Sequence, residues 1–358
     1  MSKLKNKPNI LFIPIGEQHR ASSRFRVWQM IPFLEKKGFS CKTVTYIRNV
    51  GGKGVLGTIK RKLTSRFIVE KEIRALLWWA DVIVIQEALL SKSLLRTIEK
   101  LNKKVIFDFS DPIHLMHLDE GLSLLHRTLF LLFQRPKFLK TLKISESAII
   151  ENDSLLEVTE AFNCKSYVMR GPIDCENFLP RNTITSDEIV LGWTGSPSTY
   201  GFIKPLLPLI DELGSAYKLK LILVGCGQQD IQLNNVQVTI EPWSLDNERN
   251  IIPQFDIGLF NLRDTTWDKA RGGGKIFVYM ACGVPFISPD LGIGRQVYNE
   301  SGAGKLVTSE NDWKDSLLYL INNHKQREAL SLMARKYAQE NYSHEAYSVT
   351  WLKILGSS

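Results

Sequence analysis

Two patterns of hydrophobic residues alternate along the first half of the chain. Short runs rich in Val, Ile and Phe predict strands at Asn9–Ile15, Cys41–Tyr46, Asp81–Gln86, Lys104–Asp108 and Ser147–Ile150. Between them, apolar residues at helical spacing predict helices at Arg26–Lys37 and Lys92–Asn102. Strands that alternate with helices indicate a parallel sheet covered by helices on both faces.

The same alternation restarts after Pro180. It predicts strands at Ile189–Gly192, Leu219–Val224, Gln237–Ile240, Ile257–Phe260, Pro285–Ile287 and Lys305–Val307, and helices at Pro205–Leu213, Lys275–Ala281, Trp313–Asn322 and Gln326–Glu340. The stretch Gly171–Glu188 is polar with two prolines and is the natural linker. We therefore expect an α/β protein with two Rossmann-like, doubly wound parallel-sheet domains, residues 1–175 and 186–342, facing a central cleft. Ligands of such sheets bind in loops at the carboxyl ends of the strands.

Composition narrows the class of protein. The 358 residues are 44% hydrophobic and 23% charged, which excludes a disordered or collagenous chain. Five scattered cysteines without a CxxC pair indicate reduced thiols rather than a disulfide framework or a zinc site. No apolar run approaches the roughly 20 residues that span a bilayer, and the N-terminus lacks a signal-peptide cleavage site. We expect a cytoplasmic protein.

Charge is distributed unevenly between the two halves. Residues 1–175 contain 29 Lys and Arg against 17 Asp and Glu, whereas residues 176–358 contain 17 against 20. A basic half beside a near-neutral half indicates an anionic partner for the first half, such as a phosphorylated lipid, a membrane surface or a nucleic acid. Nothing resembles an RNA-stacking motif or a recognition helix, so we do not expect a nucleic acid.

Two segments of the first half are candidates for membrane contact. Gly54–Arg74 is basic, with Leu56, Ile59, Leu63 and Phe67 at helical spacing. It predicts either a helix on an anionic membrane at the inner face of the cell membrane, which the charge excess favours, or an ordinary surface helix. Leu122–Phe133 is the most apolar stretch and predicts either a membrane or lipid-acceptor contact or, more commonly, a buried helix.

The segment Asp264–Asp290 has the sharpest chemical pattern. Three glycines, including Gly273 and Gly274, precede Lys275 and a predicted helix, and Arg271 lies four residues before the lysine. Glycines allow a backbone to approach a ligand closely, and a helix start attracts an anion. The pattern predicts a diphosphate cradle, with a flexible surface loop as the alternative. It is not a Walker P-loop, because no Ser or Thr follows the lysine.

Two further glycine-rich corners follow predicted strands of the second half. Gly195 and Ser196 lie in GWTGSP, and Gly292, Ile293 and Gly294 follow the strand that ends near Ser288. Each corner by itself fits an ordinary connection. Their shared position at strand carboxyl ends favours ligand loops.

The first half has its own candidates at strand ends. Gly16 ends the first strand, and Arg24 lies near a helix start, where the dipole disfavours a cation and an anionic ligand would offset it. Asp108 and Asp111, in FDFSDP, are expected in the loop beyond the fourth strand, facing the cleft. Sugar binding, proton transfer and simple turn capping all fit such carboxylates. His114 and His117 have no third ligand, so we expect no metal.

Together these segments resemble glycosyltransferase family 4. The resemblance covers nearly the whole chain and is carried by NILFIPIG, ASSRFRVWQMIPFLEKKG, ADVIVIQEALL, KVIFDFSDPI, GPID, LGWTGSPSTYGFI and FDIGLFNLRDTTWDKARGGGKIFVYMACGVPFISPDLGIG. It implies a GT-B fold and sugar transfer from a nucleotide sugar with retention of configuration. It also implies that the second domain holds the donor, the first meets the acceptor, and a last helix at about 345–358 crosses back to the first domain.

By position, the resemblance implies the following roles in the second domain. Arg271 and Lys275 match basic positions close to the donor diphosphate. Gly195 and Ser196 match the turn beneath that diphosphate. Pro242–Trp243 matches the loop beside the nucleobase.

The resemblance also implies which positions face the donor sugar. Gly292–Gly294 matches the loop that faces the donor sugar. Asp108–Asp111 matches the strand end that meets the sugar from the other domain, and Arg24 could assist at the phosphate or the acceptor. The sequence departs from the family where many members carry glutamates: Val278 and Gln296 stand at two such positions.

The sequence thus predicts a retaining glycosyltransferase with a UDP- or GDP-linked sugar donor, no cofactor and no metal. The expected acceptor is a glycan or a polyprenyl- or other lipid-linked glycan, in cell-surface polysaccharide biosynthesis. Two alternatives remain open. One is a GT-B nucleotide-sugar epimerase, and the other is a non-catalytic nucleotide- or sugar-binding partner in a glycan assembly complex.

Overall fold

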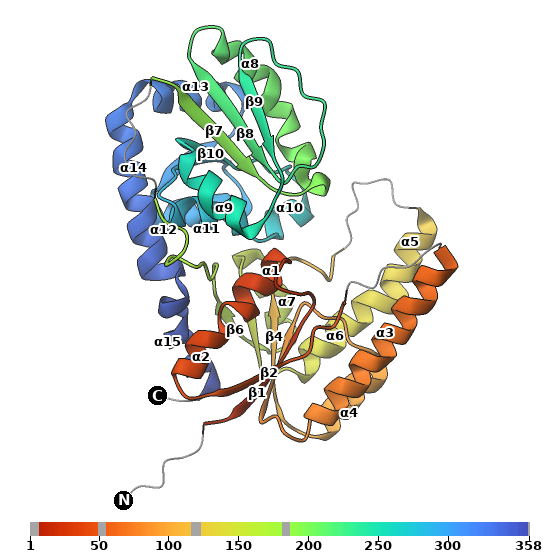
Figure 1. Ribbon diagram of the computed structural model, residues 1–358. Helices are drawn as coiled ribbons and strands as arrows, with labels where there is room; N and C mark the ends of the chain where they lie inside the picture. Colours follow the sequence, from red (N-terminus) through yellow and green to blue (C-terminus); the bar gives the residue numbers. More distant parts are fainter. Residues whose placement is uncertain (1–6, 49–54, 116–122, 181–186, 357–358) are drawn as a thin grey trace, which may run out of the picture. The chain divides into compact units, whose positions relative to one another are not determined.

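The computed structural model describes residues 7–48, 55–115, 123–180 and 187–356, and for residues 55–63 it describes the backbone alone. The chain forms two compact units (Figure 1). Unit 1 comprises Met1–Pro172 and Tyr347–Ser358, and unit 2 comprises Ile173–Ala346. The chain thus leaves unit 1 at Pro172, within the segment expected to be the linker, and returns to it in its last helix.

Unit 1 is built on a six-stranded parallel sheet. In chain order its strands are β1 (Asn9–Pro14), β2 (Ser40–Thr43), β3 (Val82–Gln86), β4 (Lys104–Phe109), β5 (Ser147–Ile150) and β6 (Lys165–Val168). Their spatial order is β2-β1-β3-β4-β5-β6. The chain direction across the sheet therefore reverses between β1 and β3, and in such sheets ligands typically bind at the carboxyl ends of the strands beside this switch point.

Helices cover both faces of this sheet (Figure 1). They are α1 (Ala21–Ser23), the π-helix η1 (Arg24–Trp28), α2 (Ile31–Lys36), α3 (Val55–Leu76), α4 (Lys92–Lys100), α5 (Leu124–Leu129), the π-helix η2 (Phe130–Gln134), α6 (Arg135–Ile144), the short η3 (Asp153–Leu155), α7 (Leu156–Glu160) and α15 (His344–Leu355). Phe138 of α6 packs against Phe107 and Phe109 of β4, with ring centroids 5.2–5.3 Å apart. On α15, Trp351 makes an edge contact with Phe12 of β1. These aromatic contacts fix one helix layer and the returning C-terminal helix to the sheet.

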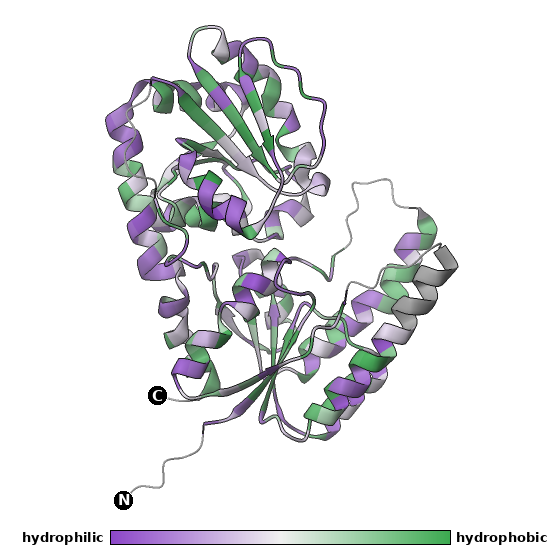
Figure 2. Ribbon diagram, viewed as in Figure 1, coloured by the Kyte–Doolittle hydropathy of each residue, from purple (hydrophilic) through white to green (hydrophobic). Residues whose placement is uncertain are grey.

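Unit 2 repeats the architecture. Its parallel strands are β7 (Ile189–Thr194), β8 (Leu219–Val224), β9 (Gln237–Glu241), β10 (Ile257–Leu259), β11 (Phe286–Pro289) and β12 (Gly304–Val307). They are ordered β12-β11-β10-β7-β8-β9, which puts the switch point between β7 and β10. The central strands β7 and β8 are largely buried, and much of their length is coloured as hydrophobic in Figure 2. Gly192 is required in β7, because a Cβ there would lie 2.0 Å from the Phe255 ring.

The helical elements of unit 2 follow the predicted alternation. They are η4 (Pro197–Phe202), η5 (Lys204–Leu206), α8 (Leu207–Gly214), α9 (Leu245–Ile251), η6 (Ile252–Gln254), α10 (Thr266–Ala270), α11 (Gly274–Ala281), α12 (Gly292–Ser301), α13 (Glu310–Asn322), α14 (His324–Tyr337) and η7 (Ala338–Tyr342). Ser309 caps α13 in a capping box with Asp312. Such reciprocal bonds satisfy backbone N–H groups that a helix start would leave free.

The predicted α/β class with two doubly wound parallel sheets is confirmed, and all eleven predicted strands are present. The sequence missed β6 because this edge strand, KSYV, is only partly buried and lacks an apolar run. Among the described residues, no helix is both long and apolar enough to cross a membrane.

Candidate functional site

The carboxyl edge of the unit 2 sheet gathers the predicted donor-binding residues. Because all strands are parallel, their carboxyl ends share one edge. Gly195 and Ser196 follow β7, and Pro242–Trp243 follows β9. Gly273 and Gly274 open α11 in the connection that follows β10, and Gly292–Gly294 opens α12 after β11. Local glycine signals in the sequence therefore converge at the switch point of one sheet.

Lys275 is the most unusual cation of this edge. Its ammonium lies 4.8 Å from the ring centroid of Trp193, a fully buried residue of β7, and its side chain is half-buried. In the described part of the chain it makes no hydrogen bond or ion pair. Burial, and secondarily the charge of Arg271, lowers the pKa of Lys275 from 10.5 to about 7. A desolvated ammonium without a carboxylate partner would gain from binding an anion.

Two arginines share one buried carboxylate beside this lysine. Asp268, fully buried at the start of α10, accepts a hydrogen bond of 2.9 Å from Arg263 Nε and lies 3.6 Å from Arg271 Nη1. Both guanidinium groups lie over the ring of Phe202, 5.1 Å and 5.2 Å from its centroid. The carboxylate and the ring orient the two arginines.

Sequence reasoning missed Arg263. No glycine pattern surrounds it, and its role depends on Phe202, which lies in a different loop. The available signal was the charge series Arg263, Asp268 and Arg271, an acid between two arginines.

The turn after β7 packs tightly against its neighbours. A Cβ at Gly195 would lie 2.2 Å from the Trp193 ring, and one at Gly225 would lie 2.3 Å from the Gly195 carbonyl oxygen. Gly225 also has φ +82° and approaches the Cβ of Trp243. The predicted diphosphate turn and the predicted nucleobase loop are therefore neighbours.

A cavity opens at the carboxyl ends of β8 and β9. It has a volume of about 680 Å³ and is lined by Gly227–Asp230 and Ile240–Pro242. Small-molecule sites typically enclose about 300–1,000 Å³. Of the predicted site residues, it includes Pro242.

The loop at the start of α12 also packs closely. Gly292 has φ +51°, and a Cβ there would lie 2.6 Å from the carbonyl oxygen of Lys269. A Cβ at Gly273 would lie 2.7 Å from the side chain of Ile293, which is fully buried. The prediction that Ile293 binds the donor can therefore apply to its backbone alone, because its side chain is packed beneath Gly273.

In unit 1, Gly16 lies at the switch point in a well-bonded turn. Its N–H donates to Ser23 Oγ (3.1 Å), Ser23 Oγ donates to Gln86 Oε1 (2.8 Å), and Trp28 Nε1 donates to the Gly16 carbonyl (3.2 Å). Arg24 begins the π-helix η1 and is buried, with its guanidinium 4.5 Å from the Phe25 ring centroid. Arg24 does lie near a helix start, as expected, and its side chain is buried.

The expected placement of Asp108 is wrong. The residue lies within β4, whose strand continues to Phe109, and its carboxylate is buried rather than in the loop. Arg26 Nε donates to it at 2.5 Å, and Arg26 Nη1 donates to Glu151, Met169 O and Gly171 O at 3.2, 3.0 and 2.7 Å. Burial raises the pKa of Asp108 to about 6, although Arg26 opposes the shift.

Asp111, by contrast, lies in the loop after β4 as expected and is half-buried. His114 stacks on Phe138, and burial lowers its pKa to about 4. His117 and Gly54 of the basic segment lie outside the described residues, as do the side chains of Leu56, Ile59 and Leu63. Within the described residues, no three His, Cys, Asp or Glu side chains are grouped as metal ligands.

Glu87 is a second candidate that sequence reasoning missed. It follows β3 at the unit 1 switch point, is buried, and has φ +54°, which is unfavourable for a residue with a side chain. Its carboxylate accepts hydrogen bonds from Ser22 Oγ (3.0 Å) and Ser110 Oγ (2.5 Å). Strained residues persist where the surrounding structure holds them, often at functional sites.

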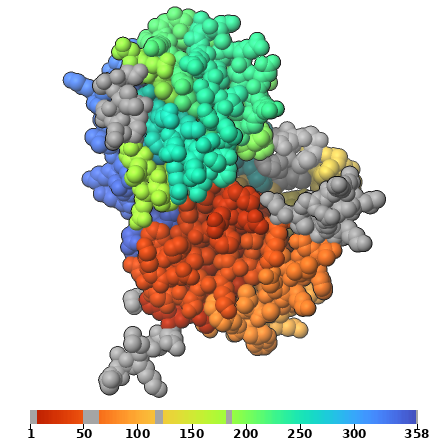
Figure 3. Space-filling model, in the orientation of Figure 1, coloured from red at the N-terminus to blue at the C-terminus, as the bar shows by residue number. Residues whose placement is uncertain are grey.

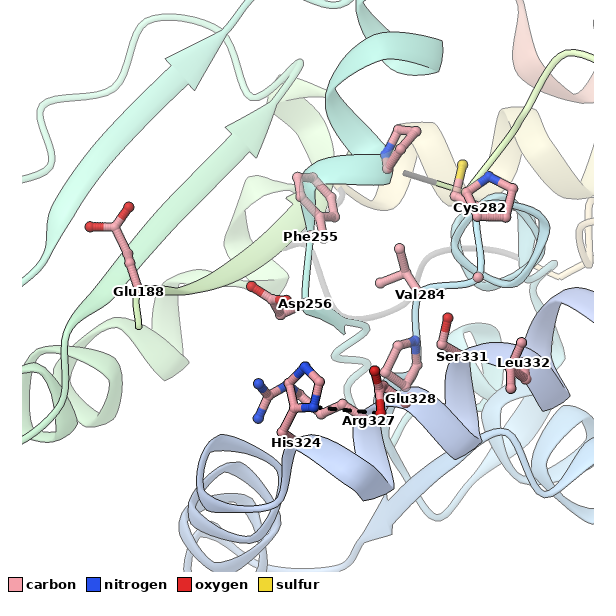
Figure 4. A pocket seen from close by; sticks show the side chains of 14 residues that line it. Glu188, Phe255, Asp256, Cys282, Val284, His324, Arg327, Glu328, Ser331 and Leu332 are labelled. Carbon is pink, nitrogen blue, oxygen red and sulfur yellow. Dashed lines mark ion pairs between the residues drawn. The ribbon is translucent and has the colours of Figure 1, made fainter. Parts of the chain in front are cut away.

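A different pocket lies at the opposite edge of the unit 2 sheet (Figure 4). It has a volume of about 480 Å³ and is lined by residues that precede strands, among them Glu188, Asp256 and Pro285. From α14, His324 and Glu328 reach it and approach each other to 3.5 Å. It contains none of the predicted site residues, so the carboxyl edge remains the candidate site.

Comparisons with known proteins establish the fold. No protein-family model and no curated protein sequence matches the chain. Among solved structures, sucrose-phosphate synthase from Thermosynechococcus elongatus matches with a TM-score of 0.72 and 12% identity over 97% of this chain and 98% of that one. HepE from Anabaena, solved with UDP and glucose, matches with a TM-score of 0.62 and 13% identity over 98% and 100%.

A third match is WaaG, a glycosyltransferase involved in lipopolysaccharide biosynthesis, with a TM-score of 0.63 and 13% identity over 97% of this chain and 100% of that one. At such identities the likeness concerns architecture alone. In each case it extends over essentially the full length of both chains. The chain therefore has the GT-B fold of these glycosyltransferases.

Proposed function

We propose that the chain is a retaining glycosyltransferase resembling family 4, which transfers a sugar from a nucleotide-diphosphate sugar to a glycan or lipid-linked acceptor. The observation that carries the proposal is the Lys275 ammonium. It lies against Trp193 at the switch-point edge of unit 2, beside Arg271 and with no carboxylate partner among the described residues. HepE, which shares the fold, was solved with UDP and glucose, which supports a UDP-linked donor here.

The chemistry of sugar transfer explains why cations belong at this edge. Breaking the bond between the anomeric carbon and the diphosphate leaves negative charge on the departing phosphate oxygen. Lys275, Arg271 and Arg263 would stabilise that charge, and such preorganised electrostatics is typically the largest catalytic contribution. We expect these residues to supply the stabilisation without a metal.

The resemblance to glycosyltransferase family 4 implies that the sugar keeps its anomeric configuration during transfer. In the same-face mechanism, the departing phosphate oxygen accepts the proton of the acceptor hydroxyl while the hydroxyl oxygen bonds to the anomeric carbon. This step needs no carboxylate base from the protein. Asp111 remains the predicted residue that orients the sugar, whereas buried Asp108 would act only by positioning Arg26.

The proposal for the acceptor rests on the positive charge of unit 1. Unit 1 carries the basic excess, so we propose a polyprenyl-phosphate or other lipid-linked glycan as the acceptor, in cell-surface polysaccharide biosynthesis. WaaG, of similar architecture, is involved in lipopolysaccharide biosynthesis, which is in keeping with this choice. The protein would work in the cytoplasm, at the inner face of the membrane.

A thermal-shift panel with UDP, GDP, ADP, CMP and dTDP tests the donor site. A ligand that binds only the folded state, at about 100 times its dissociation constant, adds about 2.7 kcal/mol of stability. We expect a shift with UDP that Lys275→Ala abolishes and Lys305→Ala leaves unchanged. Lys305 is a matched control, because its ammonium likewise lies over an aromatic ring, 4.1 Å from the Tyr319 centroid.

Transfer itself is tested with UDP-sugars and lipid-linked glycans, with the product's anomeric configuration read by NMR. A product of inverted configuration would contradict the retaining mechanism. Conversion of the nucleotide sugar without any acceptor would instead favour the epimerase. Nucleotide binding with neither transfer nor hydrolysis would favour the non-catalytic partner.

A further inference from the structure

One helical segment of unit 1 projects apolar side chains without a core to receive them. Every residue from Ser123 to Arg135 is exposed except Phe130, which is half-buried, and neither α5 nor η2 contains a buried residue. The segment carries six large apolar side chains with exposed fractions between 43% and 80%: Leu124, Leu125, Leu129, Leu131, Leu132 and Phe133. The sequence favoured a buried helix here, and that expectation is wrong.

The neighbouring helices show that this exposure is specific to the segment. On α3, Phe67 and Ile68 are also exposed, but Val69 and Ile73 of the same helix are buried in the core. On α6, which continues η2, Phe138 and Leu142 are buried. Figure 1 shows α5 beyond the part of this helix layer that covers the sheet, and Figure 3 shows yellow atoms of this region of the chain on the outer surface. Exposed apolar patches of this extent mark interaction sites.

The charge of this segment together with α6, which follows it, is uniformly positive. Residues 121–145 contain five Lys and Arg and no Asp or Glu. In the described part of the chain, Arg127, Arg135 and Lys137 make no ion pair. Burial lowers the pKa of Lys137, and the nearby charges of Arg66 and Lys92, opposed by Glu70, contribute to the shift.

We propose that the segment Ser123–Gln134 is the membrane-docking element of this protein, and that its occupant is an anionic lipid bilayer. Its leucines and Phe133 enter the boundary between headgroups and acyl chains, while Arg127, Arg135 and Lys137 meet the lipid phosphates. The inference deepens the proposed function, on which it rests for its purpose, because it gives unit 1 direct access to a lipid-linked acceptor.

Charge complementarity selects this occupant over a second copy of the chain. A two-fold contact would place Arg127 and the cations at the start of α6 close to those of the other copy, with no acid in residues 121–145 to offset them. An anionic bilayer satisfies both features at once, since it accepts apolar side chains and attracts cations. Basic amphipathic helices with large apolar residues are typical of this mode of binding.

The test is flotation of the full-length protein with phosphatidylcholine vesicles, with and without phosphatidylglycerol. We expect strong binding only with phosphatidylglycerol, weakened by added salt. The triple variant Leu125→Gln, Leu129→Gln, Leu132→Gln removes one stripe of the segment, and we expect it to bind at least about tenfold more weakly. Neutralising Arg127 or Lys137 with Gln should weaken binding about fivefold per residue.

Leu332→Gln is the matched control, because Leu332 of α14 is 74% exposed on unit 2. It should bind as the unchanged protein does. The three leucines, Arg127 and Leu332 are exposed, so the thermal midpoints of their variants should stay equal, and a loss of binding in them cannot come from unfolding.

Two results would overturn the proposal. One is a triple variant that floats with anionic vesicles as well as the unchanged protein. The other is an unchanged protein that dimerises in light scattering while the triple variant is monomeric, which would make the segment a contact between copies. Flotation needs neither donor nor acceptor, and the UDP thermal shift needs no lipid. Failure of the docking surface is therefore distinguishable from failure of the donor site.

Discussion

The two sheets of this protein are both parallel and doubly wound, but the charges at their carboxyl ends are balanced differently. In unit 1, Arg26 lies between the carboxylates of Asp108 and Glu151, and all three side chains are buried. In unit 2, Arg263 and Arg271 share one carboxylate, and Lys275 lies against Trp193. In the first cluster the single cation is compensated by two carboxylates, whereas in the second Lys275 has no carboxylate partner among the described residues.

The comparison teaches how to separate a structural charge cluster from a binding one. Both clusters lie at or close to the carboxyl ends of parallel strands, so position alone does not distinguish them. A cation that is already paired with carboxylates of the fold gains little from binding an anionic ligand. A desolvated cation without a carboxylate partner lowers the stability of the unliganded protein, and binding of an anionic ligand offsets this loss.

The largest expected effect is on the compensated cluster. Arg26→Met would leave Asp108 and Glu151 buried without their cation, and we expect it to lower the free energy of unfolding of unit 1 by about 3–5 kcal/mol. Hydrogen exchange at the amides of β4 and β5 measures this unit separately. Arg335→Met is the matched control in unit 2, because Arg335 donates to the carbonyl oxygens of Cys175 and Phe178 instead. Equal exchange rates in both variants would remove the distinction between the clusters.

The uncompensated cluster should respond in the opposite way. We expect Lys275→Met to keep or slightly raise the thermal midpoint of the free protein, because a desolvated charge is removed. UDP affinity should fall by about 1.5–3 kcal/mol, the range for hydrogen bonds to charged groups. Calorimetric titration with UDP measures it, with Lys305→Met as the control. An unfolded Lys275→Met protein would show that the lysine is structural.

The pH dependence of UDP binding tests whether the charge of Lys275 contributes to binding. Lys275 has a pKa of about 7 in the folded protein, so it loses its charge as the pH rises above that value. UDP affinity should fall above pH 7, by up to about tenfold per pH unit. Lys275→Arg should abolish this fall, because an arginine stays protonated. A pH-independent affinity in the unchanged protein would place the lysine outside the diphosphate site.

The stability of the free protein should move in the other direction. The pKa of Lys275 is lower in the folded than in the unfolded chain, so between about pH 7 and 10 the unfolded chain binds more protons. The contribution of this group to stability therefore rises with pH across that window. Comparing thermal midpoints with those of Lys275→Met isolates it, because the variant lacks the titrating group.

The sequence predicted features that depend on residues close together in the chain. It did not predict features that depend on contacts between distant residues. Apolar runs identified every strand except β6, whose half-exposed residues form an edge. The glycines and Lys275 could be recognised because they are close together in the chain. Asp108 was misplaced because Arg26, its partner, lies 82 residues earlier in the sequence. Whether α5 would be covered depended likewise on what the rest of the fold offers it, and its exposure is invisible in the sequence.

Substituting Arg263 should have the smallest effect on UDP affinity. Its comparison with Arg271 tests which cations of the unit 2 cluster contact the diphosphate. Its side chain is 43% exposed, while that of Arg271 is 21% exposed, although both lie over Phe202 and beside Asp268. Solvent screens the more exposed cation, so Arg263→Gln should weaken UDP binding by less than about 1 kcal/mol, and Arg271→Gln should cost more. Each variant leaves Asp268 with the other arginine as its partner, so both should fold. Calorimetric titration of the pair ranks the two cations. A larger loss for Arg263→Gln would mean that the diphosphate lies nearer the loop after β10 than the start of α11, and the role assigned to Lys275 would then pass to Arg263.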